Sequence, residues 1–185
     1  MIKTFVGPMH SGKTAALMLE YNKFYNKEHV KCFKPILDTR DVGYIRSNDF
    51  DVKIPCIGIV KFSDILKYID DGVKTVFIDE AQFLKGSVAP LLKLSMEMDI
   101  DVYVVGLNMT AELKPFLVMP NIMAISDEVS VIKASCYDCG RDANYTYYEG
   151  TKATIVVGNQ GYFPLCSKCY NIRKYRSKIS KYDKK

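Results

Sequence analysis

The 185-residue sequence contains no apolar run that approaches the roughly 20 residues needed to cross a bilayer. Its first residues, Met1-Ile2-Lys3, lead directly into a strand-like segment and lack the pattern of a signal peptide. We therefore expect no contact with a membrane and a cytoplasmic location. With 48% hydrophobic residues, the chain can bury one substantial core and a small second domain.

The sequence has two histidines, and they are weak evidence for a histidine-based catalytic site. His10 lies within a glycine-containing loop, where its backbone matters more than its ring. His29 lies in a predicted turn between a helix and a strand. We assign neither ring a catalytic role.

Basic residues are concentrated at the C-terminal end, and the rest of the chain has no excess of positive charge. From Lys168 onward, eight Lys and Arg residues face one Asp, a net charge of +7, so the formal charge of +5 leaves −2 for the remainder. A short basic terminus is at least as often solvated as bound to a polyanion. We therefore do not expect the protein to bind nucleic acid.

The strongest motif is the run GPMHSGKT, which lies between a predicted strand at residues 1–6 and a predicted helix at 14–25. Its spacing fits a phosphate-binding loop, in which consecutive backbone N–H groups surround an anion. Lys13 would then contact the β- and γ-phosphates of ATP, and Thr14 would offer its hydroxyl to Mg²⁺. The alternative is a chance match in a glycine-containing turn. The candidate ATP-binding residues of this run are Gly7, Pro8, Met9, His10, Ser11, Gly12, Lys13 and Thr14.

Two adjacent acids follow the apolar segment at residues 73–78. Asp79, at the end of the predicted strand, would be the second magnesium ligand. Glu80 would lie near the γ-phosphate, where a carboxylate can accept the proton of an attacking hydroxyl. The alternative for Glu80 is a surface residue at the start of a helix.

Apolar strands alternate with helical patterns along the first 130 residues, which predicts an α/β fold with a RecA-like parallel sheet. Further strands are predicted at 30–36 and 102–106, a helix at 88–98, and a flexible loop at 41–50. Near Ser135 the composition changes to Cys, Tyr, Gly and Asn. We expect an ATP-binding domain at 1–133, a small second domain at 134–172, and a basic tail at 173–185.

Four of the six cysteines form two Cys-x-x-Cys pairs, which are separated by 26 residues. Cys136, Cys139, Cys166 and Cys169 have the spacing of a closed structural zinc site, in which four thiolates leave no open position for catalysis. The alternative is a set of redox pairs. Cys32 and Cys56 stand alone and are expected to be ordinary apolar residues.

Five segments together closely resemble the type II thymidine kinases. They are GPMHSGKT, LDTR, FIDEAQF, GLNMTAELKPF, and the cysteine pairs flanking VVGNQGYF. The resemblance runs from Met1 to about Cys169. It implies that the protein transfers the γ-phosphate of ATP to the 5′-hydroxyl of thymidine and so makes dTMP for DNA precursor salvage. It also implies Mg²⁺, a structural Zn²⁺ and a homotetramer.

The resemblance assigns roles to particular residues. Glu80 matches the family's catalytic acid, Asp79 and Thr14 the magnesium positions, and Lys13 the phosphate lysine. Asp38 and Arg40 match the segment that approaches the transferred phosphate and the metal. The segment from about Glu149 to Gly161 resembles the lasso that closes over the thymine, so the resemblance makes residues 134–172 a zinc-ribbon and lasso domain. The residues that match the base pocket are Met9, Phe83, Leu107, Thr146, Val156, Val157, Gly158 and Tyr162.

The sequence departs from the family in three places. Asn108 to Ala111 replace the usual Asp-Gly-Thr-Phe, and the segment from Val157 to Cys166 is one residue shorter than in animal relatives. The chain also stops soon after Cys169, which suggests a viral or bacterial member and favours a large cytoplasmic DNA virus. Two other functions stay open at this point: a nucleic-acid-dependent ATPase with a zinc ribbon, and a zinc-ribbon interaction module whose nucleotide site regulates assembly.

Overall fold

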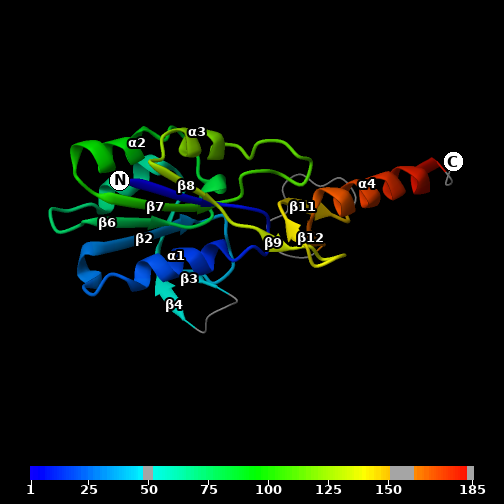
Figure 1. The fold of residues 1–185 in the computed structure, drawn as a ribbon. Coiled ribbons are helices and arrows are strands. Elements are labelled where there is room, and N and C mark those ends of the chain that lie inside the picture. Colours follow the sequence, from blue (N-terminus) through cyan, green and yellow to red (C-terminus); the bar gives the residue numbers. More distant parts are fainter. Residues whose placement is uncertain (48–51, 151–160, 183–185) are drawn as a thin grey trace.

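The computed structural model describes residues 1–47, 52–150 and 161–182, and its centre is a six-stranded sheet (Figure 1). The strand order is β5-β2-β6-β7-β1-β8, and every pairing is parallel. The strands are β1 (Ile2–Val6), β2 (Val30–Pro35), β5 (Ile57–Ile59), β6 (Thr75–Ile78), β7 (Asp101–Gly106) and β8 (Glu128–Val131). The predicted α/β fold with a parallel sheet is confirmed.

Successive side chains of the central strands point to opposite faces of the sheet. In β6, Val76 and Ile78 belong to the apolar cluster on one face, whereas Phe77 belongs to the cluster on the other. Phe77 stacks on Tyr103 of β7, with ring centroids 4.7 Å apart. Because both faces are apolar, both need a covering layer.

Helices and a hairpin supply these two layers (Figure 1). The elements over the Phe77 face are α1 (Lys13–Asn22) and the antiparallel hairpin of β3 (Tyr44–Arg46) and β4 (Lys53–Pro55). The elements over the opposite face are η2 (Phe62–Tyr68), α2 (Ala89–Leu92), its continuation η4 (Lys93–Glu97) and α3 (Met119–Ala124). Two short helices, η1 (Lys27–His29) and η3 (Ala81–Phe83), lie just before β2 and just after β6.

The C-terminal part has its own small buried cluster, which includes Ala143, Leu165 and Tyr170. It consists of two two-stranded sheets and a helix, at the end of the molecule away from α2 (Figure 1). The elements are β9 (Ala134–Ser135), β10 (Asp142–Ala143), β11 (Tyr145–Tyr148), β12 (Tyr162–Leu165) and α4 (Ser167–Tyr182). The domain boundaries expected from the sequence stay predictions.

The C-terminal helix α4 is 16 residues long. It continues through the predicted boundary between the second domain, at 134–172, and the basic tail, at 173–185. Its composition is polar and basic. Among the helices of the described residues, none combines the length and the apolar composition that a membrane crossing requires.

Two local expectations were wrong. The helix expected to reach Tyr25 ends at Asn22, because the chain then turns and packs Phe24 edge-on against Phe77, while Tyr25 is exposed. The expected flexible loop at 41–50 contains strand β3, which pairs with β4. Ile45 of β3 is buried in the apolar core, and this burial favours a strand over a loop at this position.

Candidate active site

The predicted functional residues gather at one edge of the sheet because parallel strands end on the same side. Gly7 follows β1, Asp79 follows β6, and Leu107 follows β7. The segment that carries Asp38 and Arg40 follows β2. The topology thus brings together four segments that are far apart in the sequence.

The loop between β1 and α1 has the backbone of a phosphate-binding loop. His10 and Gly12 have positive φ angles, of 60° and 76°. Gly7 lies so close to the chain after β8 that a Cβ there would be 2.1 Å from the carbonyl oxygen of Ile132. The side chain of His10 is exposed, as expected for a residue that contributes its backbone.

Lys13, the first residue of α1, extends its side chain along the same loop. Its Nζ donates to the carbonyl oxygen of Pro8 at 2.6 Å and to Ser11 Oγ at 3.3 Å. Burial of the ammonium group lowers the pKa of Lys13 to about 8, although the charges of Glu80 and Asp79 act in the opposite direction. A phosphate group would offer this ammonium a stronger, charged acceptor.

Asp79 and Glu80 lie at the end of β6, opposite the phosphate-binding loop. Thr14 Oγ1 donates to Asp79 Oδ1 at 3.4 Å, so the two predicted magnesium positions are adjacent. Burial, together with the charge of Glu80, raises the pKa of Asp79 to about 7. Glu80 has a φ of 50°, a turn in which its N–H donates to Asp79 Oδ1 at 3.0 Å.

Arg40 connects two carboxylates. Its Nε donates to Asp38 Oδ1 at 2.7 Å, and a terminal nitrogen lies 2.5 Å from Glu80 Oε1. Burial raises the pKa of Asp38, but the hydrogen bonds and charge of Arg40 and the charge of Lys34 outweigh burial and hold that pKa below its ordinary value. Asp38 is therefore held as a carboxylate, and the same guanidinium contacts Glu80.

The candidate base-pocket residues take part in several separate contacts. The Met9 N–H donates to Thr146 Oγ1 at 3.0 Å and joins the phosphate-binding loop to β11. The rings of Phe83 and Phe116 meet edge to face, with centroids 5.8 Å apart. Tyr162 packs against Tyr148, with centroids 4.6 Å apart. Three further predicted residues, Val156, Val157 and Gly158, lie outside the described residues.

Gln82 is a buried residue that the sequence analysis did not assign. Its Nε2 donates to Glu80 Oε2, and its Oε1 accepts the N–H of Leu107 at 3.0 Å. It therefore connects the end of β6 to the end of β7. The sequence feature that could have indicated this role is the position of Gln82 in FIDEAQF, two residues after Glu80. That spacing does not show that the amide contacts the residue after β7.

The segment that departs from the family pattern contacts the C-terminal part. The hydroxyl of Tyr170, next to Cys169 in α4, donates to the carbonyl oxygen of Ala111 at 2.7 Å. Asn108 Oδ1 is buried and has no hydrogen-bond partner among the described residues. The replaced residues therefore adjoin both the site edge and the helix that carries the last cysteine.

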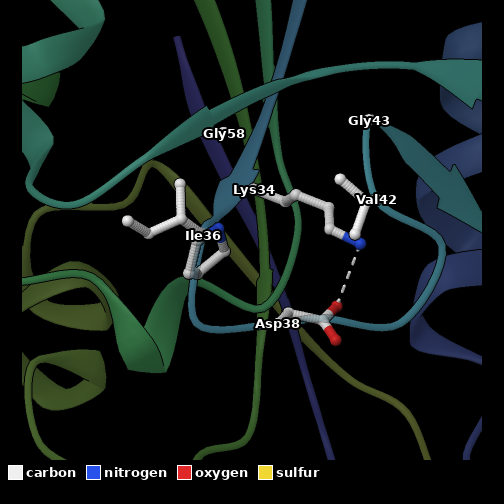
Figure 2. Close-up of a pocket in the computed structure, with 7 residues that line it drawn as sticks. Lys34, Ile36, Asp38, Val42, Gly43 and Gly58 are labelled. Atoms are coloured by element: carbon white, nitrogen blue, oxygen red, sulfur yellow. Dashed lines mark ion pairs between the residues drawn. The ribbon is translucent and has the colours of Figure 1, made fainter.

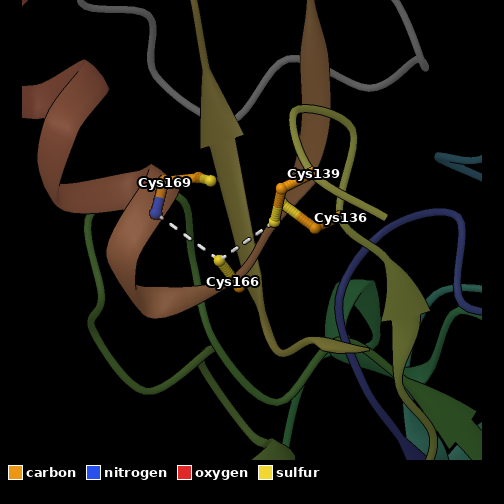
Figure 3. Close-up of side chains that lie close together, drawn as sticks. All are labelled: Cys136, Cys139, Cys166 and Cys169. Atoms are coloured by element: carbon orange, nitrogen blue, oxygen red, sulfur yellow. Dashed lines mark hydrogen bonds between the residues drawn. The ribbon is translucent and has the colours of Figure 1, made fainter. Parts of the chain in front are cut away.

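The four paired cysteines lie together and can hold a metal ion (Figure 3). Their sulfur atoms lie within 4.8 Å of one another, and Cys139 Sγ and Cys166 Sγ are 3.7 Å apart. A tetrahedral site with Zn–S bonds of about 2.3 Å would place its sulfurs about 3.8 Å apart. A hydrogen bond from Arg141 lowers the pKa of Cys139 to about 6, whereas burial raises the pKa of Cys169 to about 12, so a metal would have to displace the proton of Cys169.

Comparison with known proteins gives a consistent result. A family model described as thymidine kinase matches residues 1–170. A thymidine kinase of Pseudothermotoga lettingae is 33% identical over 172 residues, covering 90% of this chain and 92% of that protein. Thymidine kinases of the Aster yellows witches'-broom phytoplasma and of Bacteroides fragilis are 34% and 32% identical, covering 90% and 91% of this chain and 85% and 86% of their own. These relatives are bacterial, and the viral source stays a prediction.

The buried bridge made by Gln82 leads to a stability prediction. Gln82→Leu removes the acceptor for the Leu107 N–H without opening a large cavity. A buried donor left unpaired costs about 1–3 kcal/mol, so the free energy of unfolding should fall by that amount in a denaturant titration. Unchanged stability in this variant would show that the amide does not hold β6 to β7.

Proposed function

The chain belongs to the thymidine kinase family and is a kinase that acts on thymidine, and we propose that Glu80 is the base of its reaction. The observation that supports this role is the placement of Glu80 directly after the buried acid Asp79, with its carboxylate oriented by Arg40 and Gln82. A carboxylate beside the loop that would hold the phosphates could accept the proton of an attacking hydroxyl. The side chain is 20% exposed, which leaves it open to contact with a substrate.

In the proposed reaction, the 5′-oxygen of thymidine attacks the γ-phosphorus of ATP. The bond between that phosphorus and the oxygen bridging it to the β-phosphate breaks, and ADP leaves. Glu80 takes the proton of the 5′-hydroxyl. Phosphoryl transfer has a loose transition state, so alignment of the hydroxyl and stabilisation of spread charge supply most of the rate, and a weak base suffices.

The phosphates of ATP would be held by the loop from Gly7 to Thr14. His10 and Gly12 have positive φ, and Gly7 packs directly against the backbone of Ile132. These features allow a tight loop whose backbone N–H groups can surround an anion. The ammonium of Lys13 lies along the loop and would exchange its contact with the Pro8 carbonyl for a phosphate oxygen. Arg40, oriented by Asp38, would supply a second cation to the transferred group.

Magnesium would be held by Thr14 and Asp79. Their oxygen atoms are 3.4 Å apart, and hydroxyl, carboxylate and water oxygens are the ligands that Mg²⁺ prefers. When bound, the ion neutralises charge on the phosphates. Burial and the charge of Glu80 raise the pKa of Asp79, and a bound cation would oppose both effects.

The cysteine cluster would hold a structural zinc. Four sulfur ligands in a compact group are the donor set of closed zinc sites, and they leave no position for a substrate. Tyr170 and Thr146 connect this part of the chain to the site, so the metal would stabilise the segments that meet the base. A homotetramer and a cytoplasmic location remain proposals that rest on the family resemblance.

The role of Glu80 can be tested by removing its proton acceptor. Glu80→Gln changes the shape of the side chain little, and we expect turnover to fall by roughly 10²-fold or more while ATP binding is retained. Steady-state kinetics and ATP titration measure the two effects. Glu97→Gln, the same change at an exposed residue of η4, is the matched control and should behave as the parent. Parental turnover in purified Glu80→Gln enzyme would refute the assignment.

The zinc site can be tested by metal analysis. The parent should contain one zinc per chain, and Cys139→Ser should contain less because a thiolate ligand is lost. Thymidine binding should weaken before ATP binding, since the cluster supports β11 and α4 and not the phosphate-binding loop directly. Cys56→Ser, outside the cluster, should keep its metal. Much less than one zinc in the intact parent would contradict the proposal.

A further inference from the structure

Lys34, near the end of β2, is buried inside the loop that follows it (Figure 2). Its residue is 5% exposed, and Nζ lies 3.3 Å from Asp38 Oδ2. The same nitrogen donates to the carbonyl oxygens of Arg40, Asp41 and Tyr44, the last two at 3.2 Å. One ammonium group therefore gathers four oxygens from a seven-residue stretch.

These contacts account for the burial of the charge. An ammonium group removed from water is costly unless it is paired and hydrogen-bonded. Lys34 has three N–H donors, and the surrounding oxygens satisfy all of them. The neutralising carboxylate comes from Asp38, a residue of the same loop.

The loop has little apolar packing to hold it in place. Ile36, Leu37 and Val42 are 59%, 53% and 78% exposed. A cavity of about 190 Å³ lies beside the loop, lined by Lys34, Pro35, Ile36, Asp38, Val42, Gly43 and Gly58 (Figure 2). Backbone hydrogen bonds, such as that from Ile36 N to Ile59 O, fix the end of the loop next to the sheet. The polar contacts of Lys34 reach its middle.

The middle of the loop is the part that matters for the reaction. Lys34 contacts the carbonyl oxygen of Arg40, and the guanidinium of Arg40 contacts Asp38 and Glu80. The position of the guanidinium therefore depends on a backbone that Lys34 holds. A displacement of about 1 Å in a group that orients a reacting centre can cost roughly 10²-fold in rate.

We propose that Lys34 is a positioning residue for phosphoryl transfer, which acts by fixing the 38–44 backbone so that Arg40 meets Glu80. The proposal rests on the proposed function, because it needs Glu80 and Arg40 at the reacting centre. Lys34 itself does not touch the substrate. Its contribution should appear in turnover and not in the affinity for thymidine.

The experiment replaces Lys34 by methionine, which has a similar length and no donors. In the full-length enzyme, Lys34→Met should lower turnover by roughly 10²-fold, with the Michaelis constants of thymidine and ATP within about threefold of the parent. Lys31→Met, the same change on the same strand but away from the loop, should be neutral. Turnover within about threefold of the parent would overturn the proposal.

A double-mutant cycle separates positioning from general destabilisation. If Lys34 acts through Arg40, Lys34→Met should cost less than about threefold when added to Arg40→Ala. An undiminished cost in that background would overturn the proposal. If Lys34→Met does not fold, Lys34→Arg keeps the charge but displaces the loop with a larger group, and should lower turnover about tenfold with unchanged Michaelis constants. Parental turnover in that variant would also overturn it.

The same assay distinguishes this proposal from the assignment of Glu80. Glu80→Gln is measured beside the Lys34 variants. If Glu80→Gln is impaired and Lys34→Met is not, only the role of Lys34 fails. If Glu80→Gln has parental turnover, the base itself is wrongly assigned and the proposed function fails at that residue.

Discussion

The guanidinium of Arg40 lies between the carboxylates of Asp38 and Glu80, and the arrangement of the site depends on this contact. Parallel strands bring Asp38, Asp79 and Glu80 to one edge of the sheet. Carboxylates that lie close together repel one another when they are ionised. Arg40 holds the pKa of Asp38 down, whereas burial and the charge of Glu80 raise that of Asp79. The edge thus contains two acids that share the guanidinium of Arg40 beside one buried acid, Asp79, which we propose as a magnesium ligand.

The C-terminal part is coupled to this edge by two hydrogen bonds. Thr146 in β11 accepts the N–H of Met9 in the phosphate-binding loop, and Tyr170 in α4 donates to Ala111. Tyr170 directly follows Cys169, a member of the cluster of four cysteines that can hold a metal ion. A metal held by the four cysteines would therefore stabilise the contacts with Met9 and Ala111, and in our proposal it has a structural role only.

The sequence predicted the parts of the site that depend on local pattern. The phosphate-binding loop, the acids after β6 and the paired cysteines are short motifs whose spacing carries their geometry. The parallel sheet followed from apolar strands alternating with helices. The structure adds that these motifs share one edge of the sheet.

Tertiary contacts explain what the sequence did not predict. Lys34 and Gln82 are polar residues beside or within apolar segments, and their importance comes from oxygens and N–H groups supplied by other parts of the chain. The polar sequence around β3 predicts a loop, because Ile45 is the only buried residue of this strand. The strand forms because it pairs with β4 and because Ile45 joins the apolar cluster that includes Leu17 and Met18.

The most direct test of the account is a product measurement. The purified enzyme is incubated with ATP and Mg²⁺ and with each nucleoside in turn, and separately with single-stranded and double-stranded DNA. The account predicts that thymidine yields ADP and thymidine monophosphate in equal amounts and that DNA does not stimulate ADP release. ADP release that depends on DNA and yields no thymidine monophosphate would contradict it.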